Sequence, residues 1–244
     1  MKISATSYAE AAELVESWIS EKKSRYICIC SVNNIMSGRR NPEHRAIVNS
    51  ADLATSDGMP LVWFLRLSGM RKQKRVYGPN LMLEICRSSA KKGHRIFLYG
   101  AIDATLEALE RNLKNKFPGL LIAGKYAPPF RPLTSEEDKS ATELIRQSEA
   151  DIVFVGLSTP KQEKWMFEHR KTLNCVMVGV GAAFDFHAGK VRQAPAFFQK
   201  LSLEWFYRFC MEPRRLFKRY LTQNPVFLML SIFHLLGISI PPRK

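Results

Sequence analysis

Short apolar runs alternate with amphipathic stretches over the first three quarters of the chain. Continuous apolar runs predict strands that are covered on both faces, as in a parallel sheet. They span residues 26–32, 53–55, 95–99, 120–123, 151–155 and 174–180. Helices are predicted at residues 9–20, 42–50, 61–67, 103–117, 134–149 and from 160 onward. This alternation in units of roughly 30 residues indicates an α/β fold with a parallel sheet.

Several helix starts have recognisable signals. Asp103 is a plausible N-cap, Thr134 and Glu137 form a capping-box pattern, and Pro160 suits the first position of a helix. These signals place the predicted helices between the strands. The loops that join strands to helices can therefore be located by residue number.

The pattern changes after Gly189, and no further strand is predicted. Basic and aromatic residues mark helices around 194–210 and 213–221, and an apolar run follows from Val226 to Ile240. This run of 15 residues falls short of the roughly 20 that span a bilayer. We therefore predict an α/β core at residues 1–189 and a basic, amphipathic, helical membrane-association appendage at residues 190–244.

The charge of the chain is large and unevenly distributed. The chain has 37 Lys and Arg against 22 Asp and Glu, a formal net charge of +15. This excess predicts an anionic partner: nucleic acid, a membrane surface or a phosphorylated substrate. Residues 190–244 contain ten Lys and Arg and two acids, so +8 of the +15 lies in the predicted appendage.

The cysteines and the N-terminus bear on the compartment. Five scattered cysteines without a Cys-x-x-Cys pair indicate buried free thiols in a reducing compartment. The first residues show no apolar segment of the kind found in signal peptides. We therefore expect an intracellular protein.

The candidate chemistry lies in the loops after the predicted strands, because ligands of parallel sheets bind at the carboxyl ends of the strands. Asp57 lies in Ser-Asp-Gly-Met-Pro, between a strand and a helix. A carboxylate there can accept a proton from a substrate hydroxyl, although an Asx-turn or an N-cap explains the same pattern. Asn33 and Asn34 follow the first strand, where their amides could bind a sugar or base or form a turn.

Two glycine-containing turns could approach a phosphate. Gly156 begins Gly-Leu-Ser-Thr-Pro-Lys-Gln-Glu, just before a helix whose first backbone amides suit an anion. Lys161 and Gln162 would add donors, although an ordinary turn between a strand and a helix is equally consistent. The turn that contains Gly181 matches only part of the dinucleotide fingerprint, which makes it a weak signal.

Three further groups of residues have competing explanations. Asp185 and His187 suggest a metal site, but a lone Asp/His pair is more often structural and no third ligand lies nearby. The five cations between residues 66 and 75 are typical of a solvated surface, with one member available for a diphosphate. Residues 208–219 mix basic and aromatic residues, which suits a helix in the membrane interface. An oligomer contact or a nucleic-acid patch is the alternative, although no nucleic-acid-binding motif is recognisable.

A set of segments distributed between about residue 25 and residue 222 carries the most specific signal. The segments are residues 52–63, 75–80, 96–101, 155–165, 179–190, 192–195, 203–208, 212–216 and 219–221. In this order they resemble the WecG/TagA/CpsF glycosyltransferase family (glycosyltransferase family 26). The resemblance implies a Rossmann-like core with a C-terminal membrane appendage.

The resemblance also implies the activity of an inverting hexosyltransferase. Such an enzyme moves N-acetylmannosamine, its uronic acid or glucose from a UDP-sugar to a polyprenyl-diphosphate-linked glycan, in cell-envelope or exopolysaccharide synthesis. The implied location is peripheral, on the cytoplasmic face of the inner membrane. The implied partners are the donor, the lipid-linked acceptor and anionic lipids. A homo-oligomer is compatible with the resemblance, and neither a cofactor nor nucleic acid is expected.

Individual residues acquire roles from the same resemblance. Asp57 would be the general base. Asn33, Arg75 and Gln162 would lie near the donor sugar and diphosphate, with Lys161 and Asp185 as further substrate-binding candidates. The glycines that would border the nucleotide are Gly100, Gly156 and Gly181. The basic residues that would meet lipid diphosphate or head groups are Arg208, Arg214, Arg215 and Arg219.

One missing motif bears on whether the reaction needs a metal, and the sequence is also compatible with two other functions. No Asp-x-Asp pair ends a predicted strand, so a metal-independent reaction fits better. A non-catalytic, membrane-associated nucleotide-binding protein is the first alternative. A nucleic-acid-binding protein is the second, and it is disfavoured because much of the charge lies beside the apolar C-terminal run.

Overall fold

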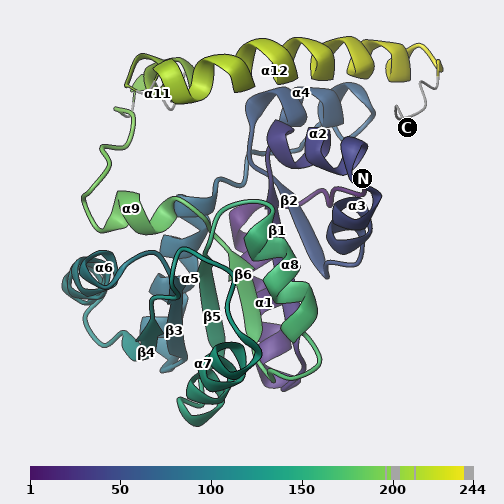
Figure 1. Cartoon of the computed structure of the whole chain (residues 1–244). Helices are drawn as coiled ribbons and strands as arrows, with labels where there is room; N and C mark the ends of the chain where they lie inside the picture. The colour runs from purple at the N-terminus through teal and green to yellow at the C-terminus, as the bar shows by residue number, and fades with distance from the viewer. Residues whose placement is uncertain (196, 199–203, 212, 239–244) are drawn as a thin grey trace.

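A single six-stranded sheet forms the centre of the molecule. The computed structural model describes residues 1–195, 197–198, 204–211 and 213–238. The strands lie in the order β2-β1-β6-β5-β3-β4, and every neighbouring pair is parallel. They are β1 (Arg25–Cys30), β2 (Leu53–Ser56), β3 (Arg95–Gly100), β4 (Leu121–Tyr126), β5 (Ile152–Gly156) and β6 (Val176–Gly179). The predicted α/β fold with a parallel sheet is therefore confirmed, and the arrangement is Rossmann-like (Figure 1).

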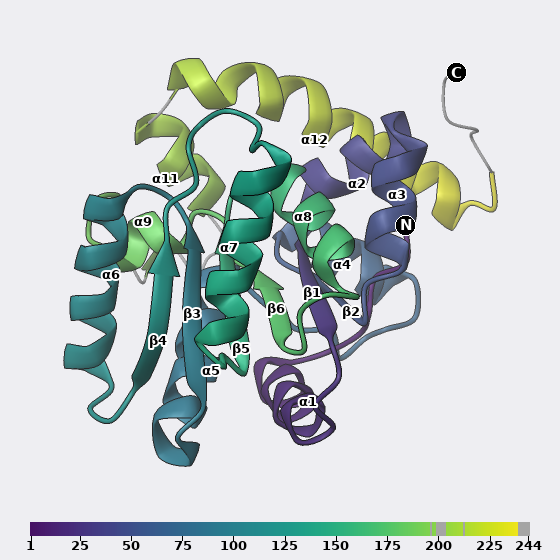
Figure 2. The same cartoon turned by 60° about the horizontal axis from the view of Figure 1, so that its bottom comes forward.

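Helices cover both faces of this sheet, as Figures 1 and 2 show. The core on one face is completed by α1 (Tyr8–Ser20), α5 (Gly78–Lys92), α6 (Asp103–Lys116) and α9 (Ala183–His187). The core on the other face is completed by α2 (Val32–Arg40), α3 (Pro42–Asn49), α4 (Met59–Leu67), α7 (Ser135–Gln147) and α8 (Lys161–His169). The C-terminal helices are α11 (Glu204–Met211) and α12 (Pro213–Leu235).

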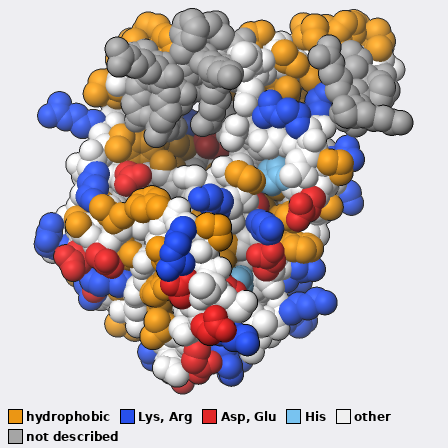
Figure 3. All heavy atoms as spheres, viewed as in Figure 1, with side chains coloured by type: hydrophobic (Ala, Val, Ile, Leu, Met, Phe, Trp, Pro, Cys, Tyr) orange, Lys and Arg blue, Asp and Glu red, His pale blue; other side chains and the backbone are white. Residues whose placement is uncertain are grey.

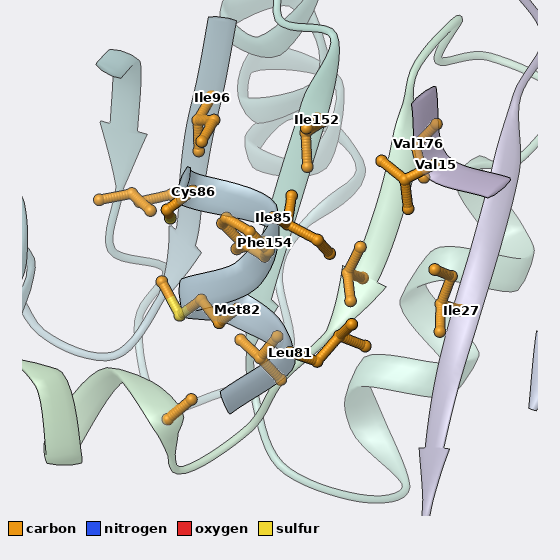
Figure 4. Packing of buried hydrophobic residues seen from close by; sticks show 14 of the residues in the cluster. Val15, Ile27, Leu81, Met82, Ile85, Cys86, Ile96, Ile152, Phe154 and Val176 are labelled. Atoms are coloured by element: carbon orange, nitrogen blue, oxygen red, sulfur yellow. The ribbon is translucent and has the colours of Figure 1, made fainter. Parts of the chain in front are cut away.

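The central strands are apolar on both faces because both are covered. Phe154 of β5 is fully buried and packs with Ile96 of β3 and with Met82 and Ile85 of α5 (Figure 4). Strands buried in this way form a close-packed and rigid base. The loops at their carboxyl ends are thereby held in fixed positions.

Two of these strands approach each other very closely at their carboxyl ends. Gly100 of β3 lies opposite Gly156 of β5. A Cβ on Gly100 would lie 2.7 Å from the carbonyl carbon and oxygen of Gly156, and its φ of +128° is rarely adopted by residues with a side chain. Glycine is therefore required at position 100 for space and for conformation. This close approach brings together the turns that follow β3 and β5.

Some local predictions are wrong by one residue or missed an element. Ile102, and not Asp103, is the N-cap of α6, and Pro160 is the N-cap of α8 instead of its first residue. No helix was predicted at Gly78–Lys92 or Ala183–His187, where α5 and α9 lie. Helix α2 was also missed, because Val32–Arg40 contains two asparagines and a glycine, which favour helices weakly. It is stabilised by a capping box between Ser31 and Asn34. Four of the five cysteines are buried as predicted, but Cys210 is exposed.

The C-terminal part of the chain differs most from the sequence-based expectation. A helix at 213–221 and a separate apolar run were predicted, but α12 is one helix that continues through Pro225 to Leu235. It packs against α2 and α4, where Phe227 is buried and its ring centroid lies 6.3 Å from that of Phe64. This contact anchors the helix beyond the proline. The division of the chain at residue 189 stays a prediction.

Candidate active site

Asp57 lies at the rim of the sheet, directly after the edge strand β2. Its backbone N–H donates to the carbonyl of Cys30 at 2.9 Å, which ties the end of β2 to the end of β1. Helix α4 starts two residues later and buries Leu61 and Leu65 against the core. The side chain of Asp57 nevertheless stays 25% exposed. The backbone of Asp57 is thus held in place, while its carboxylate is accessible to a substrate.

Arg75 makes two contacts with Asp57, so the structure brings these two predicted site residues together. Its Nε donates to the backbone carbonyl of Asp57, and its Nη2 lies 3.3 Å from Asp57 Oδ1. The guanidinium also lies 4.2 Å from the centre of the Tyr77 ring. The loop that carries Arg75 is held by buried Gln73, whose Nε2 donates to Ser56 Oγ at 3.0 Å.

A cavity of about 840 Å³ opens at the carboxyl ends of β3, β5 and β6. Its volume lies within the range of sites that hold small molecules and cofactors. Four predicted substrate-binding residues line it: Gly156, Lys161, Gly181 and Asp185. Gly100 is not among the lining residues, although its neighbour Ala101 is. Figure 3 shows a face of the molecule that is hollowed beneath the C-terminal helix and bordered by side chains of both charges.

Aromatic rings form part of the cavity wall. Tyr99 and Trp165 both line the cavity and stack with their ring centroids 4.3 Å apart, and Trp165 stacks in the same way on His169. Burial raises the pKa of the Tyr99 hydroxyl, which therefore stays neutral at physiological pH. Both rings are almost completely buried, and their faces stack on each other, on Tyr126 and on His169, so they shape the cavity wall rather than offer a free stacking face. Sequence analysis missed both residues as site candidates, because one lies in a strand and the other in a helix.

A buried polar network lies between Asp57 and the cavity. It contains the candidate residues Asn34 and Gln162, but its central residue was missed. Its centre is the carboxylate of Glu163, which is completely inaccessible to solvent. Glu163 Oε1 accepts hydrogen bonds from Asn34 Nδ2 at 2.8 Å, from Thr159 Oγ1 at 2.8 Å and from Gln162 Nε2 at 3.3 Å. Gln162 Nε2 also donates to the carbonyl of Gly179 at 3.2 Å. The network therefore joins the segments that follow β1 and β5 to the end of β6.

Two further observations define this network. Glu163 Oε2 and Gln162 Oε1 are buried without a hydrogen-bond partner among the described residues. Burial raises the pKa of the neighbouring Cys30 thiol, and the negative charges of Glu163 and Asp57 raise it further. The carboxylates of Glu163 and Asp57 thus both influence the pKa of Cys30, the last residue of β1. The predicted site residue Gln162 lies under the loops and does not line the cavity.

The order of the strands sets the distance between the two parts of the site. Asp57 follows β2, and the cavity begins at β6, two strands away. Neighbouring strands lie about 4.8 Å apart, so this separation is roughly 10 Å along the carboxyl edge. A sugar diphosphate that extends from the cavity along this edge would bring its sugar toward Asp57. The two parts of the site thus suit one extended ligand.

The remaining predicted residues are less informative. Asn33 is half-buried in the first turn of α2, next to Asn34. His187 Nε2 donates to the carbonyl of Pro79 at 2.9 Å, and burial lowers its pKa, which supports the structural interpretation of this residue. The described residues contain no group of three potential metal ligands. The predicted lipid-binding side chains lie outside the described residues: Arg208, Arg214, Arg215 and Arg219.

Comparison with known proteins connects this geometry to an enzyme family. Residues 1–239 match the sequence model described as "Glycosyl transferase WecG/TagA/CpsF family". The chain is 30% identical over 205 residues to a protein of Bacillus spizizenii, an alignment that covers 84% of this chain and 78% of that protein. It is 30% identical over 212 residues to a protein of Staphylococcus aureus (strain MW2), covering 81% of this chain and 80% of that protein.

A third relative comes from Bacillus subtilis (strain 168), with 29% identity over 203 residues, 83% of this chain and 77% of that protein. All three relatives have the same name: N-acetylglucosaminyldiphosphoundecaprenol N-acetyl-beta-D-mannosaminyltransferase. The segments quoted from the sequence are thus part of a similarity that extends over most of the chain.

Proposed function

Since the chain belongs to the WecG/TagA/CpsF family of glycosyltransferases, we propose that it transfers N-acetylmannosamine from a UDP-sugar to N-acetylglucosamine on a polyprenyl diphosphate. The observation that carries this proposal is the placement of the Asp57–Arg75 pair and the 840 Å³ cavity on one edge of the sheet. The names of the relatives support the choice of donor sugar and acceptor. A donor in the cavity and an acceptor at Asp57 would meet on this edge.

Asp57 is the general base of the proposed reaction. Its carboxylate takes the proton from the acceptor hydroxyl while the hydroxyl oxygen bonds to the anomeric carbon of the donor sugar. The bond from that carbon to the UDP oxygen breaks, and its electron pair leaves with UDP. Attack from the face opposite the leaving group inverts the anomeric centre. Support comes from the exposure of the carboxylate and from its fixed position at the end of β2.

The leaving diphosphate needs compensation for its developing charge, and this chain offers cations and backbone amides for it. Arg75 lies beside Asp57, and Lys161 lines the cavity at the start of α8. An arginine can bind a diphosphate through two nitrogens, and preorganised donors act on charge without reorganising. We propose that these groups suffice without a metal. Gly156 and Gly181 let the backbone approach the nucleotide, and Asp185 is a candidate for a ribose or base contact.

The lipid-linked acceptor requires that the protein works at a membrane, and α12 is the element proposed to bind it. In the described part of the chain, no helix combines the length and the apolar character needed to cross a bilayer. Leu228 and Ile232 of α12, and Leu236 in the turn directly after it, follow one another at four-residue spacing and are exposed. We call these three residues the apolar face of α12. A helix with such a face lies in the membrane interface, here on the cytoplasmic side of the inner membrane.

A transfer assay with defined substrates tests the proposed function. The full chain is mixed with UDP-N-acetylmannosamine and a short-chain polyprenyl-diphosphate N-acetylglucosamine, and the disaccharide product is measured by mass spectrometry. We expect product, UDP release that depends on the acceptor, and an unchanged rate in the presence of EDTA. Binding of nucleotide sugar without any transfer would favour the non-catalytic alternative. Salt-sensitive binding of DNA or RNA without nucleotide-sugar binding would favour the nucleic-acid alternative.

Substituting the apolar face of α12 should weaken membrane binding. In the triple variant Leu228→Ser, Ile232→Ser, Leu236→Ser, less apolar area enters the lipid, so affinity for phosphatidylglycerol vesicles should fall by about tenfold or more. Co-sedimentation measures the affinity. The matched control is the triple variant Leu14→Ser, Leu121→Ser, Leu144→Ser. It removes three similarly exposed leucines from the surface of the α/β part of the chain. An equal loss in both variants, or no loss in the α12 variant, would contradict the role of α12.

A further inference from the structure

Helix α4 has an apolar side that no described element covers. Leu61, Val62 and Leu65 are buried in the core, and Phe64 contacts the rings of Phe227 and His234 in α12. Trp63 and Leu67, in contrast, are 49% and 72% exposed. Two large apolar side chains one helical turn apart therefore lie next to each other on the surface.

The helical periodicity places this pair beside α12. Each residue of an α-helix is rotated by about 100° from the previous one. Seen down the helix axis, Trp63 and Leu67 are about 100° and 60° to one side of Phe64, which contacts α12. The buried residues Leu61 and Leu65 are about 60° and 100° to the other side. Trp63 and Leu67 thus project from the flank of α4 that lies next to α12 and away from the core.

The segment that continues from this flank is strongly basic. Residues 58–83 contain five Lys and Arg and no Asp or Glu. Arg71, Lys72 and Lys74 are exposed, and none of them forms an ion pair with a described residue. Unpaired cations next to exposed apolar residues match the charge of anionic lipid head groups above apolar acyl chains.

We propose that Trp63, Leu67, Arg71, Lys72 and Lys74 form a second membrane-binding surface, which belongs to the core and is independent of the C-terminal appendage. We call it the α4 surface, and its partner is a bilayer that contains anionic phospholipid. Trp63 and Leu67 enter the boundary between head groups and acyl chains, where tryptophan is enriched. The three cations bind lipid phosphates.

The position of the α4 surface gives it a consequence for the reaction, and this part rests on the proposed function. Helix α4 begins two residues after Asp57 and is nine residues long, which corresponds to about 13 Å. A bilayer bound along the flank of α4 would hold the Asp57 carboxylate at a fixed position relative to the lipid surface. The α4 surface would thereby align the general base with the sugar of a lipid-linked acceptor.

Fluorescence quenching by brominated lipid tests the surface directly. The full chain is bound to vesicles of phosphatidylglycerol and brominated phosphatidylcholine, and its tryptophan emission is compared with that in vesicles without bromine. The chain contains four tryptophans, so the difference between wild type and Trp63→Phe isolates residue 63. We expect the quenched fraction to fall in Trp63→Phe and to remain in Trp18→Phe, whose indole is buried. Equal quenching in wild type and Trp63→Phe would overturn the proposal.

A pair of matched variants separates the α4 surface from the proposed reaction. The variant Leu67→Ser, Lys72→Glu should lose vesicle affinity by about tenfold or more, since each basic residue near a lipid surface contributes about a factor of five. The control Leu144→Ser, Lys139→Glu makes the same changes on α7 and should bind like wild type. Rates with a water-soluble acceptor should be unchanged in both, and only the α4 variant should be slow on acceptor embedded in vesicles.

The outcomes of this comparison are distinguishable. If the α4 variant binds vesicles as tightly as the wild type, the proposal that the α4 surface binds membranes is refuted, whatever the transfer assay shows. Absence of transfer by the wild-type protein with any acceptor would refute the proposed function, while the quenching experiment would still decide on the surface. Circular dichroism of both variants excludes unfolding as the cause of a loss.

Discussion

Replacing Asp57 with asparagine is expected to reduce the rate of sugar transfer by about a hundredfold to ten-thousandfold, the usual contribution of a general base. An asparagine keeps the backbone carbonyl and a side-chain oxygen, which are the two acceptors that Arg75 contacts in the structure. The local geometry should therefore survive, and only the ability to take a proton is lost. The measurement is turnover in the transfer assay, together with the affinity for UDP and the melting temperature.

The control for this substitution is Asp103→Asn, which removes an exposed carboxylate from the first turn of α6. It should retain turnover within a factor of two or so, because surface substitutions of this kind change little. The melting temperature and UDP affinity of Asp57→Asn should stay close to those of the wild type. Turnover of Asp57→Asn at the wild-type rate would exclude Asp57 as the base.

The second large effect is expected at Glu163, through stability. Alanine at this position removes the acceptor shared by Asn34, Thr159 and Gln162, and leaves buried donors with fewer partners. Unsatisfied buried donors and lost charge-assisted hydrogen bonds should lower the free energy of unfolding by about 3 kcal/mol. Urea denaturation measures this change. The transfer rate should fall as well, since the network holds the ends of three strands in register.

Two comparisons make the Glu163 prediction specific. Glu143→Ala removes an exposed carboxylate from α7 and should change the free energy of unfolding by less than about 0.5 kcal/mol. Glu163→Gln keeps one acceptor oxygen and should be less destabilised than Glu163→Ala. If Glu163→Ala unfolds at the same urea concentration as the wild type, the network does not stabilise the strand ends.

The strands of the core and most of its helices could be predicted because each depends on local pattern, while α2, α5 and α9 were missed. All six strands were found from continuous apolar runs, which arise because the helices cover both faces of the sheet. Asp57 was singled out because it lies in a loop after a strand, and Arg75 through the resemblance of residues 75–80. The structure places the two in contact, and their roles stay predictions. The periodicity was less reliable for single positions. Leu14, for example, is an apolar residue of the predicted helix at residues 9–20, but it is 38% exposed in α1.

The residues that were missed depend on contacts that no local pattern reveals. Glu163 was missed because its partner Asn34, itself a candidate, is 129 positions away and meets it only when β1 and β5 lie in one sheet. Tyr99 and Trp165 became cavity residues for the same reason, since they come from β3 and α8. The predicted helix end at residue 221 was wrong for a different reason. α12 continues past Pro225, where tertiary contacts of Phe227 with α4 sustain the helix.

The position of β2 at the edge of the sheet has a kinetic consequence. Asp57 follows this edge strand and precedes α4, which α12 contacts, whereas the cavity proposed for the donor opens at strands nearer the opposite edge. In the proposed reaction the two substrates would therefore approach from different phases, the donor from water and the acceptor from the bilayer. For such an enzyme the effective acceptor concentration is its mole fraction in the membrane. Diluting the acceptor with inert lipid should slow transfer even when its amount per volume is constant.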